Sequence, residues 1–378
     1  MTLTRISSDE SYDVVVVGAG IVGLAHAAWA FDAGLRVLLL ERDHRAVGAS
    51  VRNFGHICVT GQSGELRELA GIARERWLEL GRRASLEVRE TGGVVVARHP
   101  DELAVVEELS SRGHEGLGLL NAAEVRRKLG ECGADDIVGG AELRSDLRVD
   151  PRVAAPRLAR WLAEQSAVDV LFCTNYLGFD GHTVHTSRGS ARCQRVIVCV
   201  GHDLDYLYPE LAEAHDVARC ALQMALVEAP AGVVIDPAVL TATSLLRYSA
   251  FAGTHASQAL RHRLAATRPD LLDIDANIMM TQRPDGTLII GDSHHTEPTA
   301  DAFLSERTSD TLRRAMCEIL GVDSLTFHQR WQGVYASSPH NDYLVAELSD
   351  RVSVRVVTAG VGMTIAFGLA QRYFPSPA

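Results

Sequence analysis

One glycine-rich segment of the sequence has the spacing of a phosphate-binding turn. Residues 18–23 read Gly-Ala-Gly-Ile-Val-Gly, which matches the pattern G-x-G-x-x-G. In such a turn Gly18 permits the tight bend, Gly20 lets the backbone approach a pyrophosphate, and Gly23 lets helix and strand pack closely. The N–H groups and the positive dipole at the start of the helix attract the phosphates. The segment therefore predicts a dinucleotide site.

An acidic residue follows the turn where dinucleotide-binding proteins hold the ribose. Glu41 stands about 20 residues beyond the glycines. A carboxylate at this place accepts hydrogen bonds from ribose hydroxyls and disfavours a 2′-phosphate, so we do not expect NADP. NAD and FAD both remain compatible with these residues.

The residues around the turn predict the strand–helix–strand unit that such a site needs. Val14 to Val17 form a β-branched run, which is typical of a parallel strand buried on both faces. Helical periodicity runs from Ile21 to about Ala33, and Gly34 closes the helix. A second apolar strand from Val37 to Leu40 then ends at Glu41.

Strand-and-turn segments of the same kind recur in the middle and at the end of the chain. We expect further strands at 91–100, 196–200, 219–228 and 278–291, the last with a turn at 284–287, and helices at 64–84, 101–113, 121–130, 150–167, 255–267 and 303–320. This distribution predicts an α/β fold in which a discontinuous Rossmann-like domain carries an inserted, mixed-sheet α+β domain.

Composition excludes several classes of protein. The chain has 378 residues, 47% of them hydrophobic, and a formal charge of −11. A general nucleic-acid or anionic-membrane binder would need a cationic face, so we expect neither partner. No apolar run reaches the roughly 20 residues needed to cross a bilayer, and no signal peptide is visible. The seven cysteines include no C-x-x-C pair. We therefore expect free thiols and a cytoplasmic location.

Three further segments resemble the glycine and D-amino-acid oxidase (DAO) type of FAD-dependent oxidoreductase. They are RVIVCVGHDLDYLYPEL at 195–211, TAGVGMTIAFGLA at 358–370 and GASVRNFG at 48–55. The resemblance implies that FAD is the cofactor and that the glycine turn holds its ADP part. It also implies that the C-terminal G-x-G-M-T turn meets the flavin ring.

The resemblance implies a cofactor-binding set and a division into domains. The set is Gly18, Ala19, Gly20, Ile21, Val22, Gly23, Glu41, Arg42, Ala49, Ser50, Arg52, Asn53, Phe54, Gly55, Tyr176, Val200, Gly201, Gly333, Gly360, Gly362, Met363 and Thr364. The FAD-binding domain would comprise residues 1–85, 145–215 and 328–378. The substrate domain would comprise 86–144 and 216–327.

Four short segments narrow the resemblance to one branch of the family. They are ASVRNFG at 49–55, GQSGEL at 61–66, RYSAF at 247–251 and GDSHH at 291–295. The branch is associated with aminophosphonate breakdown, which implies oxidation of a 2-aminoethylphosphonate-like or N-methylated amine. Two alternatives stay open: an oxidase of a glycine-type or other D-amino acid, and a flavin-binding electron-transfer subunit without turnover of its own.

The sequence departs from relatives that attach flavin covalently or use a lysine to activate oxygen. Gly333 and Arg52 stand where the attaching Cys or His would be, so we expect noncovalent FAD. Ile289 stands at about the place of the lysine, and Lys128, the sole lysine, lies elsewhere. The electron acceptor, O2 or another, stays open, with His56, Arg52 and His294 as candidate cations.

Five residues are candidates for substrate binding and catalysis: His56, Arg247, Tyr248, His294 and Tyr335. Arg247 could clamp an anion, since guanidinium donates paired hydrogen bonds. We expect Arg247 and Tyr248 on one strand, where neighbours point to opposite faces and would not share a pocket. His294 and His295 with Asp292 lack a third ligand at a recognised spacing, so we expect no metal. We expect the substrate to be a small amine that carries an anionic group and donates hydride when its nitrogen is neutral.

Overall fold

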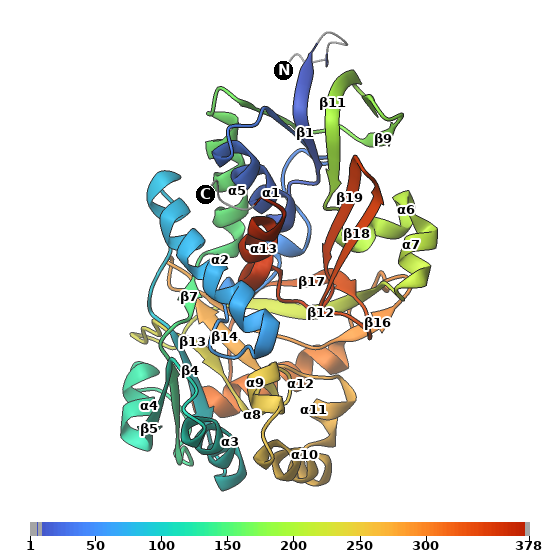
Figure 1. Ribbon diagram of the computed structural model, residues 1–378. Helices are drawn as coiled ribbons and strands as arrows, with labels where there is room; N and C mark the ends of the chain where they lie inside the picture. Colours follow the sequence, from blue (N-terminus) through green and yellow to red (C-terminus); the bar gives the residue numbers. More distant parts are fainter. Residues whose placement is uncertain (1–5, 7–9, 375–378) are drawn as a thin grey trace.

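The computed structural model describes residue 6 and residues 10–374 of the chain, and these form two sheets with helices packed around them (Figure 1). The first sheet has the strand order β18-β19-β11-β1-β2-β8, with β9 and β10 attached through β11. Strand β1 (Ser11–Val17) lies in its centre, parallel to both β11 (Gly189–Val198) and β2 (Val37–Leu40). Val14 to Val17 are at most 5% exposed. The strand–helix–strand unit expected around the glycine turn is confirmed.

Four helices cover one face of this sheet: α1 (Ile21–Asp32), α2 (Gly64–Arg83), α5 (Pro151–Ala163) and α13 (Gly362–Tyr373) (Figure 1). Helices α2 and α13 approach closely, because a Cβ on Gly368 would lie 2.2 Å from the Leu69 carbonyl oxygen. The indoles of Trp29 and Trp77 donate to backbone oxygens of α13 at 2.9 Å. These contacts hold α13 against both α1 and α2.

The second sheet has the order β16-β12-β15-β14-β13-β4-β6-β5, and β17 (Phe327–Ser337) pairs with β12 (Ala218–Val227) along its length. This pairing corrects one expected boundary. Residues 328–337, which we assigned to the first domain, belong to β17, and this strand pairs with β12 in the second sheet. The rest of the expected division into domains stays a prediction.

The remaining elements complete the two layers. The strands are β3 (His56–Ile57), β4 (Gly93–Ala97), β5 (Leu117–Asn121), β6 (Gly139–Leu143), β7 (Leu147–Arg148), β8 (Val168–Leu171), β9 (Tyr176–Phe179), β10 (Thr183–Thr186), β13 (Ala238–Leu240), β14 (Met279–Gln282), β15 (Leu288–Gly291), β16 (His295–Glu297), β18 (Tyr343–Ser349) and β19 (Val352–Val357). The helices are α3 (Pro100–Ser111), α4 (Ala122–Lys128), α6 (Leu204–Leu207), α7 (Pro209–Ala214), α8 (Ala242–Leu245), α9 (Ser249–Ala252), α10 (Ala256–Thr267), α11 (Pro269–Asp273) and α12 (Glu306–Leu320), with 3-10 turns at Ala49–Val51 and Gly201–Asp203.

Local signals place most of these elements where the sequence predicts them. Asn121 caps α4 with a reciprocal Asn–Glu capping box, and the Ser305 hydroxyl accepts from the Thr308 N–H to start α12. The expected strand at 278–291 is two strands, β14 and β15, joined by the predicted turn. Residues 247–248 are not in a strand, since they form a turn between α8 and α9.

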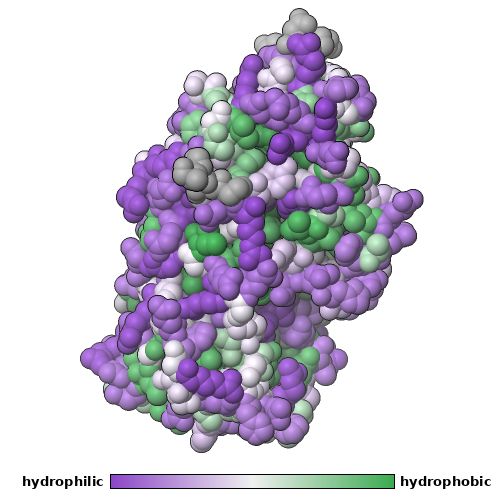
Figure 2. Space-filling view, viewed as in Figure 1, coloured by the Kyte–Doolittle hydropathy of each residue, from purple (hydrophilic) through white to green (hydrophobic). Residues whose placement is uncertain are grey.

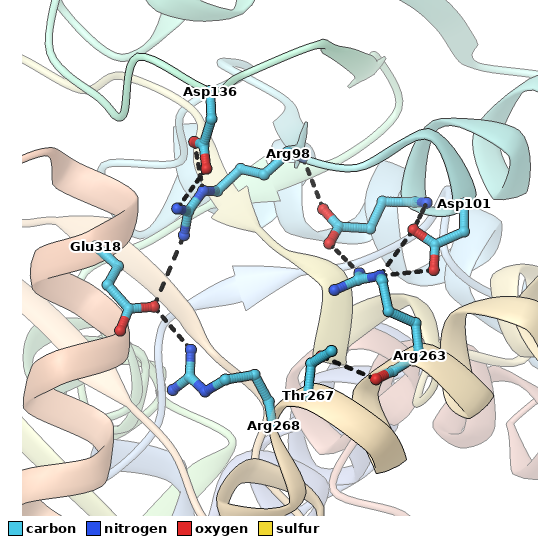
Figure 3. A network of polar contacts seen from close by, with 8 residues as sticks. Arg98, Asp101, Asp136, Arg263, Thr267, Arg268 and Glu318 are labelled. Carbon is cyan, nitrogen blue, oxygen red and sulfur yellow. Dashed lines mark hydrogen bonds and ion pairs between the residues drawn. The ribbon is translucent and has the colours of Figure 1, made fainter.

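Paired charges join the helices of the second layer (Figure 3). Arg263 on α10 binds Asp101 and Glu102 on α3, and Arg98 bonds Asp136 at 2.7 Å. Glu318 on α12 accepts from Arg268 at 2.7 Å and lies 3.8 Å from Arg98.

On the face drawn in Figure 2 most side chains are hydrophilic, and hydrophobic groups gather at mid-height. Across the described residues, every helix is too short or too polar to span a bilayer.

Candidate active site

A single continuous cavity of about 680 Å³ runs between the two sheets. At one end the ends of β1 and β2 line it with Gly18, Gly20 and Glu41. At the other end lie Arg247 and Asp292, which belong to the second layer. The cavity therefore joins the glycine turn to a cluster of polar side chains.

The glycine turn has the tight packing that its spacing predicts. Gly18 has φ +102°, and a Cβ there would lie 2.5 Å from the Cys199 carbonyl oxygen. A Cβ on Gly23 would lie 1.8 Å from the Gly18 oxygen, so helix and strand can meet only without one. Gly20 faces the cavity at the N-cap of α1, and the next N–H of the helix, that of Ile21, donates to the Ser50 Oγ at 2.8 Å. At this end of the cavity the positive end of the α1 dipole would attract an anion.

The Glu41 carboxylate is held in one orientation at the edge of the cavity. Its Oε2 accepts from the Ala19 N–H at 2.9 Å, and its Oε1 accepts from the Asp43 N–H at 3.0 Å. A carboxylate oxygen has more than one acceptor position, so further hydrogen bonds from a ligand remain available.

A second glycine turn closes the middle of the cavity. Gly360 has φ +71°, and a Cβ there would lie 3.1 Å from the Tyr335 ring. Val361, Gly362 and Met363 follow at the start of α13 and line the same cavity. The start of α13 therefore presents its backbone to the cavity beside Tyr335 of β17.

The structure brings most of the expected cofactor residues to the cavity wall. Those that line it are Gly18, Gly20, Ile21, Val22, Glu41, Arg42, Ala49, Ser50, Arg52, Asn53, Phe54, Tyr176, Val200, Gly201, Gly333, Gly360, Gly362 and Met363. Four expected residues lie behind the wall: Ala19, Gly23, Gly55 and Thr364. Gly23 and Gly55 pack against backbone oxygens, and the Thr364 hydroxyl accepts from the Cys58 N–H at 3.1 Å. These four residues therefore support the cavity wall from behind and do not line the cavity themselves.

At the polar end, four of the five candidate catalytic residues share the cavity: Arg247, Tyr248, His294 and Tyr335. The Arg247 Nη2 donates to the Tyr335 hydroxyl at 2.8 Å, and its Nη1 lies 3.3 Å from the Asp275 carboxylate. The expectation that Arg247 and Tyr248 face opposite sides was wrong, because a turn, unlike a strand, can present neighbours to one side. Burial opposes the charge of Arg247, but the acidic groups around it outweigh this effect and raise its pKa.

Asp292 is a cavity residue that sequence reasoning considered only as a metal ligand. Its side chain follows β15, is 3% exposed, and has an Oδ1 without a hydrogen-bond partner among the described residues. Burial raises its pKa to about 7, although the Arg247 charge acts in the opposite direction. A buried, unpaired carboxyl group costs free energy unless a donor completes it. Nothing in the sequence distinguishes it from an exposed turn aspartate.

His294 lies beside Asp292 but is not a cation. Burial and the positive charge of Arg247 hold its pKa well below the usual value. Its Nδ1 is 2.9 Å from the Asp275 carbonyl oxygen, and its ring meets the Tyr335 ring edge-on at 6.3 Å. His294 is therefore neutral near pH 7, which corrects its place among the candidate oxygen-activating cations.

His56 is not a cavity residue, contrary to expectation. Its Nε2 lies 2.8 Å from the Asp146 carboxylate, which also accepts from the Thr60 N–H at 2.6 Å. With Cys58, these side chains form a buried group whose potential ligand atoms lie within 4.8 Å of one another. His295 is exposed and pairs with Glu297, so it does not join His294 in a site. The expectation that the protein uses no metal stays a prediction.

The residues present fit FAD. The glycine turn stands at a helix N-terminus, and it has no room for a Cβ on Gly18 or Gly23. The Glu41 carboxylate is held in one orientation at the spacing from the turn that is typical of a ribose-binding acid. The cavity continues from there past Gly360 to the polar cluster. It is thus long enough to connect a phosphate-binding end with a reaction end.

Comparison with known proteins gives a family match over almost the whole chain. The family model described as "FAD dependent oxidoreductase" (DAO) matches residues 13–373. Glycerol 3-phosphate oxidase of Mycoplasma pneumoniae is 26% identical over 231 residues, which is 55% of this chain and 58% of that protein. The match thus spans less than two thirds of the length of this relative.

Solved structures share the fold. Glycine oxidase from Geobacillus kaustophilus has a TM-score of 0.76 at 17% identity, covering 97% of this chain and 94% of that one. L-proline dehydrogenase from P. horikoshii has a TM-score of 0.77 at 16% identity, covering 96% and 92%. L-α-glycerophosphate oxidase from M. pneumoniae, with FAD bound, has a TM-score of 0.73 at 19% identity, covering 98% and 96%. The family match and the glycine cradle together lead to one conclusion: this chain belongs to the DAO family of FAD-dependent oxidoreductases.

Proposed function

We propose that the protein oxidises a small amine that carries an anionic group, and that this group is a phosphonate. The observation that carries the proposal is Arg247, which lies half-buried at the polar end of the cavity, donates to the Tyr335 hydroxyl, and is opposite the glycine-lined end. The similar proteins include a glycine oxidase and an L-α-glycerophosphate oxidase, so one is named for an amine substrate and the other for a phosphate ester. The branch resemblance of residues 49–55 and 247–251 favours an aminophosphonate.

The residues of the chain would divide the work between the two ends of the cavity. FAD, when bound, supplies the acceptor for a hydride from the carbon next to nitrogen. Gly18, Gly20 and the start of α1 would hold its phosphates, and Glu41 its ribose. Arg247 would bind the anionic group of the substrate through paired hydrogen bonds. The walls around Tyr335 would exclude water and hold the amine in one orientation.

Anaerobic flavin bleaching tests the proposal. The holoenzyme is mixed without oxygen with 2-aminoethylphosphonate, its N-methyl derivative, glycine, D-alanine and propylamine. We expect the phosphonates to bleach the flavin at lower concentration than propylamine. Equal bleaching by charged and uncharged amines would contradict an anion clamp, and no bleaching by any amine would favour the electron-transfer subunit.

A carboxylated amine is the second candidate substrate. Glycine oxidase and iminodiacetate oxidase are among the proteins that share the fold. A guanidinium also binds carboxylate in paired fashion, so Arg247 is compatible with both anions. Stronger bleaching by glycine or D-alanine than by 2-aminoethylphosphonate would select this candidate.

We also propose that FAD is held without a covalent bond. Gly333 and Arg52 line the cavity where an attaching side chain would stand, and neither offers a nucleophile. Acid precipitation should release all the yellow colour into the supernatant. Colour that stays with the precipitated protein would contradict this. The electron acceptor, O2 or another, and a cytoplasmic location stay predictions. Of the expected oxygen-activating cations, Arg52 remains at the cavity as an arginine.

A further inference from the structure

We propose that Asp292 is a catalytic residue: it pairs with the ammonium group of the substrate and takes its proton. The inference rests on the proposed amine oxidation, because an ammonium nitrogen has no lone pair to support hydride loss from the neighbouring carbon. A group of the chain must therefore remove one proton before the oxidation.

The geometry around Asp292 points to a missing donor. The backbone is fixed, because the Asp292 N–H donates to the Asn277 carbonyl oxygen and the Asp292 carbonyl oxygen accepts from the Asn277 N–H, each at 2.8 Å. Its side chain lines the cavity, is almost fully buried, and leaves Oδ1 without a partner among the residues described. Native proteins rarely leave a buried carboxyl oxygen unpaired, so the open acceptor indicates a ligand N–H.

Among the described residues around the polar end of the cavity, no other group is a comparable proton acceptor. Arg247, from the turn after α8, is positively charged and would hold the anionic end of the substrate. His294 is a weak base because burial and Arg247 lower its pKa. Burial raises the pKa of the Tyr248 and Tyr335 hydroxyls and of the Cys220 thiol, so these stay protonated. Asp275 pairs with Arg247 outside the cavity wall.

Arg247 and Asp292 thus place opposite charges on one cavity, which suits a substrate with an anion at one end and an ammonium at the other. The step is a simple proton transfer. One N–H bond of the ammonium breaks, one O–H bond forms on the Asp292 carboxylate, and the amine keeps the electron pair. Because burial raises the pKa of Asp292 to about 7, both forms of the carboxyl group are accessible near neutral pH.

The test uses an amine that cannot be oxidised and its carbon isostere. In 2-amino-2-methylpropylphosphonate the carbon next to nitrogen has no hydrogen, and 2,2-dimethylpropylphosphonate replaces the ammonium with a methyl group. Calorimetry of the holoenzyme at pH 7, in buffers of different ionisation enthalpy, gives both dissociation constants and the protons released. The pair 2-aminoisobutyrate and 2,2-dimethylpropanoate repeats the design for a carboxylate.

In the wild type we expect the amine to bind at least about tenfold more tightly than its isostere. Binding of the amine should also release about half a proton more, because pH 7 is near the pKa of Asp292 and about half of the Asp292 carboxyl groups carry a proton before the ammonium binds. Asp292→Asn should abolish both differences. Asp275→Asn removes a like charge beside the same Arg247, but from outside the cavity, and should keep both. Unchanged proton release and preference in Asp292→Asn would overturn the proposal.

Two further measurements separate this inference from the proposed function. The wild-type preference for the amine should grow between pH 5.5 and 8.5, as Asp292 loses its proton, and this needs no variant. Flavin reduction by 2-aminoethylphosphonate at pH 7 should slow about 10²–10⁴-fold in Asp292→Asn and recover as pH rises and free amine accumulates. Normal reduction by Asp292→Asn would refute the role of Asp292 alone. A wild-type flavin that no amine reduces would refute the proposed function, whatever Asp292 binds.

Discussion

Two groups of charged side chains in the second layer differ in how completely they are paired. In the network of Figure 3, Arg263 has Asp101 and Glu102 as partners, and Glu318 is shared by Arg268 and Arg98. At the cavity, Asp292 has an oxygen without a partner, and Arg247 contacts a neutral tyrosine and an exposed aspartate. The first group is complete within the chain, and the second is not.

This difference separates stabilising charges from charges that await a ligand. A buried charge that keeps all its hydrogen bonds contributes to the fold, whereas an unsatisfied one costs free energy until a partner arrives. Removing a member of the network should therefore weaken folding and leave binding intact. Removing a member of the cavity cluster should leave folding intact and weaken ligand binding.

The largest effect should come from Arg263→Ala. Glu102 is 4% exposed, and burial already raises its pKa, so loss of Arg263 would leave a buried carboxylate without its cation. Breaking such a pair costs about 3–5 kcal/mol of unfolding free energy. Chemical denaturation of the holoenzyme measures it, with the more exposed Arg268→Ala as the control at about 1 kcal/mol or less. A loss of anion binding in folded Arg263→Ala would break the comparison.

Arg247→Ala should follow, with its effect on binding instead of folding. Losing a charge-assisted bond from a desolvated site costs about 2–4 kcal/mol. If the bond is equally strong in the ground and transition states, KM for 2-aminoethylphosphonate should rise and kcat should change little. KM for propylamine should change much less, and the flavin spectrum should stay the same. An equal rise for both amines would show that Arg247 shapes the cavity and does not bind the anion.

Glu41→Gln should weaken FAD retention at the other end of the cavity. The carboxylate is expected to accept ribose hydroxyl bonds, and charge-assisted bonds contribute about 1.5–3 kcal/mol each. Titration of the apoprotein with FAD measures the change in Kd, and Glu318→Gln in the paired network serves as the control. An unchanged FAD Kd would remove Glu41 from the site.

The first layer could be predicted from the sequence because its signals are local. The valine run of β1, the glycines of the turn and the periodicity of α1 each report on their immediate neighbours along the chain. The pairing of β17 with β12 was missed, because strand periodicity identifies a strand but not the sheet that it joins.

The polar end of the site was harder to predict because long-range contacts form it. The turn at Arg247 is fixed by a Thr241 capping box on α8 and by the Ala250 N–H donating to the Gly61 oxygen. His56 was expected in the site, yet its ring lies behind the cavity wall, 2.8 Å from the carboxylate of Asp146, a residue far along the chain. The open acceptor on Asp292 is visible only when all its neighbours are known.

The smallest expected effect sharpens the comparison within the cavity cluster. Asp275 lies 3.3 Å from the Arg247 guanidinium, but its side chain is 72% exposed, and exposed ion pairs contribute about 1 kcal/mol or less. Asp275 also has φ 44°, a conformation that asparagine adopts as readily, and its carbonyl oxygen still faces the His294 Nδ1 after substitution. Asp275→Asn should therefore fold normally and release one guanidinium donor to the ligand. We expect 2,2-dimethylpropylphosphonate to bind up to about fivefold more tightly at low salt, because 1 kcal/mol corresponds to that factor. The gain should fade as salt screens the exposed charge.

Calorimetric Kd values for the wild type, Asp275→Asn and Arg247→Ala at two salt concentrations measure this change in affinity. Tenfold weaker binding in Asp275→Asn would mean that Asp275 orients Arg247 for the anion, and the boundary of the cluster would then have to include an exposed residue.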